Sequence, residues 1–214
     1  MKAAIFDMDG TLLDSMTFWY SLRQRVVDHL DLTLPPGEGV DAKTLSEMMD
    51  YISMLSDGNI TPEEVHQVHH EIIEGYYTSE AQAKPGVVAY LDLLEKNGVR
   101  CCVATETDTP LAHLALRQAG IDEYFGFVIS AKDVGTNKHE PTIFYKAAEM
   151  LDSSISDVIV FEDSYYAAKT ATEAGFKVYS VWDENQMWRP GDITEVSELH
   201  YPTFEDYVKY RIVQ

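Results

Sequence analysis

Short apolar runs alternate with amphipathic helical patterns along most of this chain. Five runs are mostly apolar, as in strands buried on both faces of a parallel sheet: 3–6, 99–104, 127–130, 158–161 and 177–181. Between most of them, apolar residues recur every three or four positions, which predicts helices. This alternation predicts an α/β fold, a doubly wound parallel sheet. After residue 181 the sequence indicates irregular structure, then a short helix from about Phe204 to Tyr210 capped by Thr203.

A long helical stretch interrupts this alternation between residues 15 and 84. Apolar residues at helical spacing predict three helices there, near 18–30, 45–55 and 65–76. The segment Lys84-Pro85-Gly86 indicates the return to the sheet. We therefore expect an α/β core formed by residues 1–14 and 85–214, and a helical domain formed by residues 15–84.

Histidine and cysteine do not form an evident metal site. His66 and His70 share a face of the third predicted helix, but neither they nor His69 have a further ligand at useful spacing. We interpret all three as solvated side chains on a helix surface. Cys101 and Cys102 are neighbours in a predicted strand and therefore point to opposite faces, which favours two buried thiols over a disulfide.

Composition limits the classes of partner. The 214 residues include 36 acidic and 16 basic ones, which gives a formal charge of -20. Such a surface repels phosphate backbones and makes nucleic-acid binding unfavourable. No apolar run approaches the roughly 20 residues of a membrane helix, and the first strand begins too close to Met1 to leave room for a signal peptide. We expect a cytoplasmic monomer that does not bind membranes.

Carboxylates follow two of the predicted strands directly. Asp7 and Asp9 come after the run 3–6, and Glu162 and Asp163 come at the end of the run 158–161. In open α/β sheets ligands bind at this edge, and carboxylates buried so close together need a compensating cation. An all-oxygen ligand set favours Mg²⁺. An EF-hand fits poorly because no helix precedes the segment, whereas an ordinary acidic turn remains an alternative.

The segment Asp7-Met8-Asp9-Gly10-Thr11-Leu12-Leu13-Asp14 resembles motif I of the haloacid dehalogenase-like superfamily, D-x-D-G-T-L-x-D. Three further segments resemble the remaining motifs in the right order: Thr105, Lys138-His139-Glu140-Pro141-Thr142-Ile143-Phe144, and Glu162-Asp163-Ser164. The third motif is K-P-x-P-D-x-F in the family, so His139 and Thr142 depart from it. Considered without the other motifs, Thr105 could also be a helix cap, and Lys138 could be a surface lysine.

The resemblance implies a Mg²⁺-dependent phosphatase that acts on a small phosphorylated metabolite. Asp7 would be the nucleophile that becomes an aspartyl-phosphate, and Asp9 the general acid and base. The implied metal ligands are Asp7, the Asp9 carbonyl, Glu162 and Asp163. The implied phosphate-binding groups are Thr105, Lys138 and the backbone N–H of Glu106. The helical domain 15–84 resembles the caps that close over such sites and select substrates.

Two other functions remain open at this point. A mutase resembling β-phosphoglucomutase would have to hold a second phosphate, and Lys43 lies near where such caps carry a basic residue. A non-enzymatic binding protein could use the same scaffold, although the Asp7 and Asp9 pair disfavours it.

Glu106 stands where the family usually has a small or neutral residue. A carboxylate there should repel the phosphoryl group unless it points away. We expect it either to turn toward the cap side and bind a substrate hydroxyl or amine, or to cap the helix that follows.

Overall fold

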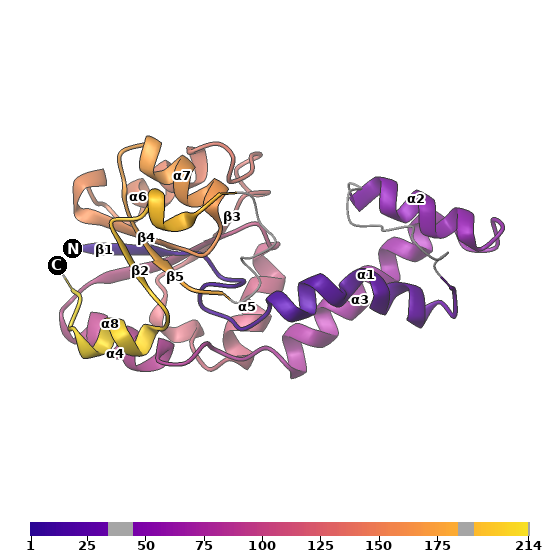
Figure 1. Cartoon of the computed structure of the whole chain (residues 1–214), viewed down its shortest axis with the longest axis horizontal. Coiled ribbons are helices and arrows are strands. Elements are labelled where there is room, and N and C mark those ends of the chain that lie inside the picture. Colours follow the sequence, from indigo (N-terminus) through magenta and orange to yellow (C-terminus); the bar gives the residue numbers. More distant parts are fainter. Residues whose placement is uncertain (34–44, 184–190, 214) are drawn as a thin grey trace. The chain divides into compact units, whose positions relative to one another are not determined.

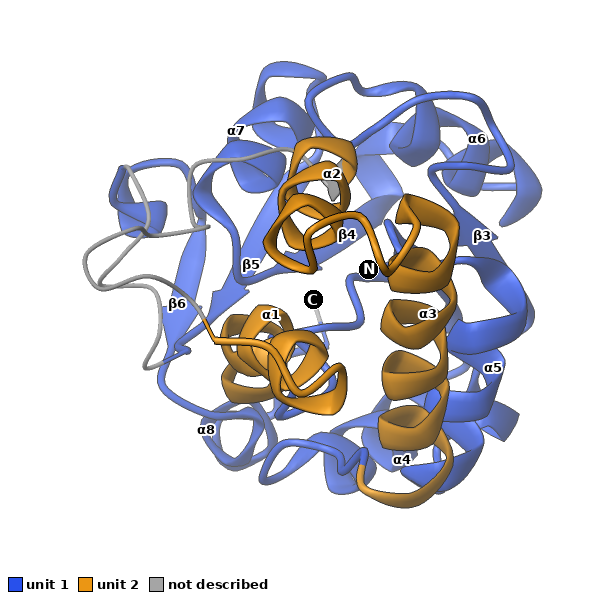
Figure 2. Cartoon of the chain, turned by 90° about the vertical axis from the view of Figure 1, so that its right-hand side faces the viewer, with its two compact units in different colours: residues 1–16, 81–214 blue, residues 17–80 orange. Residues whose placement is uncertain are grey.

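The computed structural model describes residues 1–33, 45–183 and 191–213. The chain divides into two compact units, residues 1–16 with 81–214 and residues 17–80, coloured blue and orange in Figure 2. These limits differ by a few residues from those expected from the sequence. Within the described ranges, no helix combines the length and the apolar character that crossing a bilayer requires.

Six parallel strands form the sheet of the larger unit, in the order β3-β2-β1-β4-β5-β6 (Figure 1). They are β1 Ala3–Phe6, β2 Arg100–Thr105, β3 Val128–Ser130, β4 Val158–Glu162, β5 Lys177–Val181 and β6 Leu199–Tyr201. Phe6 of β1 is in register with Val103 of β2 and with Phe161 of β4. The chain winds outward to β3 and then returns to the other side of β1. Ligands bind at the carboxyl ends of strands where a sheet reverses its winding in this way.

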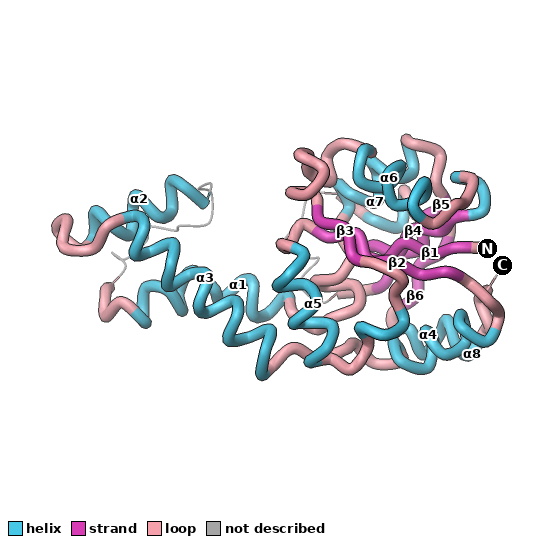
Figure 3. The backbone as a smooth tube through the Cα atoms, turned by 180° about the vertical axis from the view of Figure 1, so that it is seen from behind, coloured by secondary structure: helices cyan, strands magenta, loops and turns pink. Residues whose placement is uncertain are grey.

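Helices cover both faces of this sheet. They are α4 Val87–Lys96, α5 Thr109–Gln118, α6 Thr142–Met150, α7 Tyr165–Glu173 and α8 Phe204–Lys209. Figures 1 and 3 show α6 and α7 on one face and α4 and α8 on the other. The structure therefore confirms the doubly wound α/β core that the sequence pattern predicts.

The two faces of the sheet bury different side chains. Alternate strand residues such as Ile5 and Val160 join an aliphatic core with α6 and α7. The residues that follow them, Phe6 and Phe161, face the other way and stack with ring centroids 4.4 Å apart. Their neighbours are aromatic rings from α4 and α8, including Tyr90 at 5.6 Å from Phe161.

The two adjacent cysteines are free and buried, as expected. Cys102 belongs to the aliphatic core, and its neighbour Cys101 points to the opposite face because side chains alternate along a strand. Burial raises the pKa of the Cys101 thiol to about 12. Thiolate chemistry is therefore not expected at this residue.

The sixth strand was not predicted. Residues 199–201 form β6, where the sequence pattern indicates irregular structure. The strand is only three residues long, partly exposed and centred on His200, so it produces no apolar run. Pairing with β5 stabilises it instead, and Ser180 contacts the His200 ring at 2.8 Å between Oγ and Nδ1. The aromatic segment that includes Trp188 lies outside the described residues.

The described residues of the smaller unit form three helices: α1 Met16–His29, α2 Leu45–Leu55 and α3 Pro62–Ser79. A reciprocal capping box begins α3, because Thr61 Oγ1 accepts from the Glu64 N–H at 3.2 Å and Glu64 accepts from the Thr61 N–H at 2.7 Å. The α1 and α3 helices pack through stacked rings of Phe18 and Tyr76, with centroids 3.9 Å apart. The predicted helices of this region are therefore confirmed.

The histidines of α3 differ from the expectation in one respect. His66 and His70 are exposed, but His69 is half-buried. Burial, together with the two neighbouring histidines, lowers the pKa of His69 to about 4. Treating all three as equally solvated was therefore wrong, because His69 lies toward the packed side of the helix.

Candidate active site

Three carboxylates converge at the carboxyl edge of the sheet. Asp7 follows β1, and its backbone N–H donates to the Phe161 carbonyl of β4 at 2.9 Å. Glu162 is the last residue of β4, and Asp163 follows it. One oxygen from each of these side chains lies within 4.8 Å of the others, and all three residues are buried. The register of β1 and β4 thus brings together carboxylates that are far apart in the sequence.

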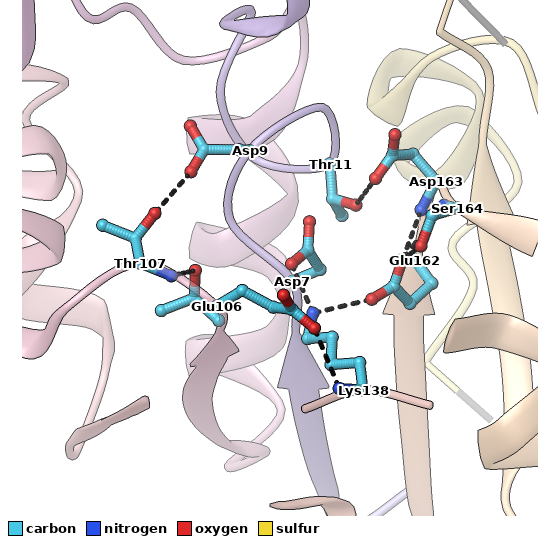
Figure 4. A network of polar contacts seen from close by, with 10 residues as sticks. Asp7, Asp9, Thr11, Glu106, Thr107, Lys138, Glu162, Asp163 and Ser164 are labelled. Atoms are coloured by element: carbon cyan, nitrogen blue, oxygen red, sulfur yellow. Dashed lines mark hydrogen bonds and ion pairs between the residues drawn. The ribbon is translucent and has the colours of Figure 1, made fainter. Parts of the chain in front are cut away.

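A buried lysine lies between two of these carboxylates. Lys138 comes from the loop between β3 and α6, and its side chain is only 2% exposed. Its Nζ donates to an oxygen of Asp7 and, at 2.7 Å, to Oε1 of Glu162 (Figure 4). The alternative of a surface lysine is therefore wrong. An ammonium group in this place offsets part of the negative charge of the cluster.

The cluster shifts the ionisation of its members. Burial raises the pKa of Asp7 well above its usual range, Lys138 opposes this, and Glu162 and Asp163 raise the pKa again. Burial also disfavours the charged form of Lys138, but Asp7 and Glu162 outweigh it and raise the pKa of Lys138. The lysine therefore stays an ammonium, while burial disfavours the charged form of Asp7 and Lys138 favours it.

The second oxygen of Glu162 is also occupied. Its Oε2 accepts from the backbone N–H groups of Asp163 and Ser164 at 3.1 and 3.0 Å, and from the Ser164 hydroxyl at 2.8 Å. Both oxygens of this buried side chain thus have donors, so its orientation is fixed. Asp163 accepts from the Thr11 hydroxyl at 3.2 Å, which ties the segment after β4 to the loop after β1.

Gly10 allows these two segments to approach each other. Its φ is +89°, in the region that favours glycine, and a Cβ atom here would lie 2.5 Å from Oδ2 of Asp163. Any other residue would therefore displace the Asp163 carboxylate. The glycine of the D-x-D-G segment serves close packing as well as the turn.

The Asp9 carboxylate has a different environment from that of Asp7. Its Oδ1 accepts from the Ser15 hydroxyl at 2.7 Å, and its Oδ2 accepts from the Thr107 hydroxyl at 3.0 Å (Figure 4). Thr107 also donates its backbone N–H to the buried Thr105 hydroxyl at 3.0 Å. Sequence reasoning did not identify Ser15 or Thr107. For Thr107, the one sequence feature that could have indicated a role is the Thr-x-Thr spacing at the end of β2.

Glu106 makes a contact that the sequence did not predict. Its Oε1 accepts from the backbone N–H of Lys138 at 2.9 Å. The expectation that Glu106 caps the following helix is wrong, because the N-cap residue of α5 is Asp108. The expected orientation toward a substrate is also wrong for this oxygen, which binds the loop backbone.

Comparison with known proteins identifies the family. The sequence profile of the haloacid dehalogenase-like hydrolases matches residues 4–181. The chain belongs to this family. Bacillus subtilis (strain 168) YhcW, which carries a phosphatase name, is 29% identical over 180 residues, covering 83% of this chain and 81% of that protein. The phosphorylated carbohydrates phosphatase of Thermotoga maritima is 25% identical over 193 residues, covering 85% of each chain.

A third relative also carries a phosphatase name, and a solved structure shares the fold. The 6-phosphogluconate phosphatase of Escherichia coli (strain K12) is 24% identical over 183 residues, covering 84% of this chain and 81% of that protein. The crystal structure of CbbY from Rhodobacter sphaeroides has a TM-score of 0.77 at 18% identity, covering 97% of this chain and 96% of that one, which shows a common fold. This haloacid dehalogenase-like hydrolase is an enzyme of the phosphatase branch.

Proposed function

We propose that this hydrolase cleaves a small phosphomonoester through an aspartyl-phosphate on Asp7. The observation that best supports this proposal is the buried Lys138 ammonium group, which contacts Asp7 and Glu162 beside Asp163 at the edge of the sheet. A dianionic phosphate needs cations to approach a carboxylate nucleophile, and this arrangement holds one next to the attacking oxygen.

The chemistry requires two displacements at phosphorus. In the first, an oxygen of Asp7 bonds to phosphorus while the ester P–O bond breaks, and Asp9 gives its proton to the leaving alkoxide. In the second, Asp9 takes a proton from a water molecule whose oxygen bonds to phosphorus, and the bond from phosphorus to Asp7 breaks. Thr105, Lys138 and the backbone N–H of Glu106 would hold the phosphoryl oxygens.

The acidic cluster fits a divalent cation. All candidate ligands are oxygens, and burial together with its carboxylate neighbours raises the pKa of Asp7, a cost that a cation would remove. Asp7, Asp163 and the Asp9 carbonyl would hold Mg²⁺, and Glu162 lies in the same group although its oxygens already have donors. When bound, Mg²⁺ would neutralise charge on the phosphoryl group.

The names of the relatives indicate a substrate class. Two of them are phosphatases of phosphorylated carbohydrates and of 6-phosphogluconate, so we propose a phosphorylated sugar, polyol or sugar acid. The helical unit 17–80 would carry selectivity among these, because the strand-end residues determine the reaction rather than the leaving group. The alternative function, a mutase, requires a binding site for a second phosphate. Lys43, the candidate residue for that site, lies outside the described residues. A cytoplasmic monomer also stays a prediction.

A phosphate-release screen over sugar phosphates, nucleotides and phospho-acids tests this function. We expect turnover of a phosphorylated carbohydrate with Mg²⁺, no turnover in excess chelator, and inhibition by Ca²⁺, which takes more ligands at longer distances. Calorimetric titration with Mg²⁺ gives a readout that does not depend on turnover, and Asp163→Asn should weaken binding. Full activity in chelator would contradict the metal assignment, and conversion of a phosphosugar to its isomer without phosphate release would favour the mutase.

A further inference from the structure

Glu106 joins two segments of the site that are 32 residues apart in the sequence. It follows β2 directly, and its Oε1 accepts from the backbone N–H of Lys138 at 2.9 Å. Figure 4 shows its carboxylate directed at the Lys138 backbone. The contact therefore links the end of a central strand to the loop that carries the buried ammonium group.

The backbone of the loop around Lys138 otherwise bonds mainly within the loop, while two of its side chains reach other elements: Lys138 contacts Asp7 and Glu162, and the His139 ring stacks on Tyr166 with ring centroids 4.3 Å apart. The backbone N–H groups of His139 and Glu140 donate to the Asn137 side chain at 2.9 Å and to the Asn137 carbonyl at 3.1 Å. The Glu140 carboxylate accepts from the hydroxyl of Thr136 at 3.1 Å. These local bonds shape the loop but do not place it relative to the sheet. The bond from Glu106 holds the backbone of Lys138, the residue whose side chain enters the site.

Two of the three departures from the family motifs, Glu106 and His139, meet at this point. A proline at position 139 would restrict the backbone of Lys138 to extended conformations, and His139 imposes no such restriction. Glu106 replaces a small or neutral residue and binds the backbone of that same lysine. The acceptor thus supplies a restraint on Lys138 where the sequence lacks the usual one.

We propose that Glu106 is a positioning residue that holds the Lys138 backbone so that the ammonium group meets Asp7. This inference rests on the proposed function, because it assigns the effect of Glu106 to the phosphoryl-transfer site. The carboxylate acts on the protein backbone and not on the leaving group. Its removal should therefore slow every substrate to a similar extent.

Three variants test this proposal: Glu106→Ala, Glu106→Gln and the matched control Glu140→Ala. We expect Glu106→Ala to lower kcat about tenfold, equally for a hydroxylated sugar phosphate and for an aryl phosphate, because one charge-assisted hydrogen bond is lost. Glu106→Gln keeps a carbonyl acceptor and should retain activity within about twofold. Glu140→Ala removes a carboxylate from the same loop without touching the Lys138 backbone and should leave kcat unchanged.

Hydrogen exchange of the Lys138 amide, measured on the protein alone, separates this proposal from the proposed function. Exchange should become faster in Glu106→Ala and stay slow in Glu106→Gln and Glu140→Ala. Unchanged exchange in Glu106→Ala would refute the tether. A rate loss confined to the hydroxylated substrate would refute positioning and indicate substrate recognition. If the wild type released phosphate from no substrate, the proposed function would fail, while the exchange data would still decide whether the tether exists.

Discussion

At the carboxyl ends of the central strands β1 and β4, a buried aromatic residue is followed directly by a buried carboxylate. Phe6 and Phe161 stack at 4.4 Å in an aromatic layer under the sheet, and the next residues, Asp7 and Glu162, contact the ammonium group of Lys138. The aromatic pair is buried at no electrostatic cost. The carboxylates and the ammonium group, in contrast, lose hydration on burial, and this desolvation raises the pKa of Asp7. In each of these strands, one residue therefore packs in the aromatic layer and the next residue belongs to the charged cluster.

This difference indicates which interactions stabilise the fold and which serve chemistry. Stacked rings gain free energy from burial and packing. Buried charges gain little net stability, because the cost of desolvation offsets their attraction. The aromatic layer should therefore add net stability with little effect on activity. The charged edge should dominate activity, although removing the ammonium group of the buried cluster also destabilises the fold because its carboxylate partners stay buried without it. Variants of residues in the aromatic layer and at the charged edge test this distinction.

The largest expected effect is that of Asp7→Asn. The neutral amide oxygen is a far weaker nucleophile than a carboxylate oxygen, so we expect kcat to fall at least about a thousandfold. The thermal midpoint should change little, because the relief of repulsion with Glu162 and Asp163 offsets the lost pair with Lys138, which keeps Glu162 as a partner. Phosphate release and thermal unfolding check this, with Asp14→Asn as an exposed control from the same segment. Near-normal turnover by folded Asp7→Asn would end the proposed mechanism.

Lys138→Met should affect both activity and stability. It leaves Asp7 and Glu162 buried without their ammonium partner, which costs about 3–5 kcal/mol in the free energy of unfolding. Activity should fall about 100- to 1,000-fold, because the variant loses the cation that we propose binds the phosphate. Urea unfolding with and without Mg²⁺ tests this, because added Mg²⁺ should restore part of the stability. Lys146→Met, which alters an exposed pair with Glu149, should change stability by less than about 0.5 kcal/mol.

Phe161→Leu examines the aromatic side of the comparison. It loses ring contacts with Phe6 and Tyr90, and we expect a loss of about 1–3 kcal/mol in the free energy of unfolding. Turnover per folded molecule should stay within about twofold, because no charged group moves. Tyr20→Leu replaces a ring that is 47% exposed and should cost far less. A loss of turnover as large as that in Lys138→Met would show that the two sides are not separable.

The sequence predicted the parts of this molecule that depend on continuous local patterns. Five strands were found because their apolar runs are long enough, and the three-residue β6 was missed because His200 interrupts it. Asp7 and Lys138 were proposed as neighbours from motif positions, and the structure brings them together.

Contacts between two loops could not be predicted in this way. The bond from Glu106 to Lys138 joins residues 32 apart, and the bond from Thr107 to Asp9 joins residues 98 apart. Each depends on how two turns place polar groups relative to each other, and no periodicity in the sequence records that. Glu106 stood out only as a departure from a motif, and its partner came from the structure.

Thr107→Val has the smallest expected effect and tests such a contact. It removes the hydroxyl that donates to Asp9 Oδ2, while the Ser15 hydroxyl still holds Oδ1, so Asp9 stays near its place but loses a restraint. We expect kcat to fall about fivefold, which corresponds to about 1 kcal/mol for one hydrogen bond. Thr107→Ser should keep wild-type turnover. Thr109→Val, whose hydroxyl donates to Asp133 instead, is the matched control from the same turn. An equal loss in Thr107→Val and Thr109→Val would show that the turn as a whole matters, and not the contact with Asp9.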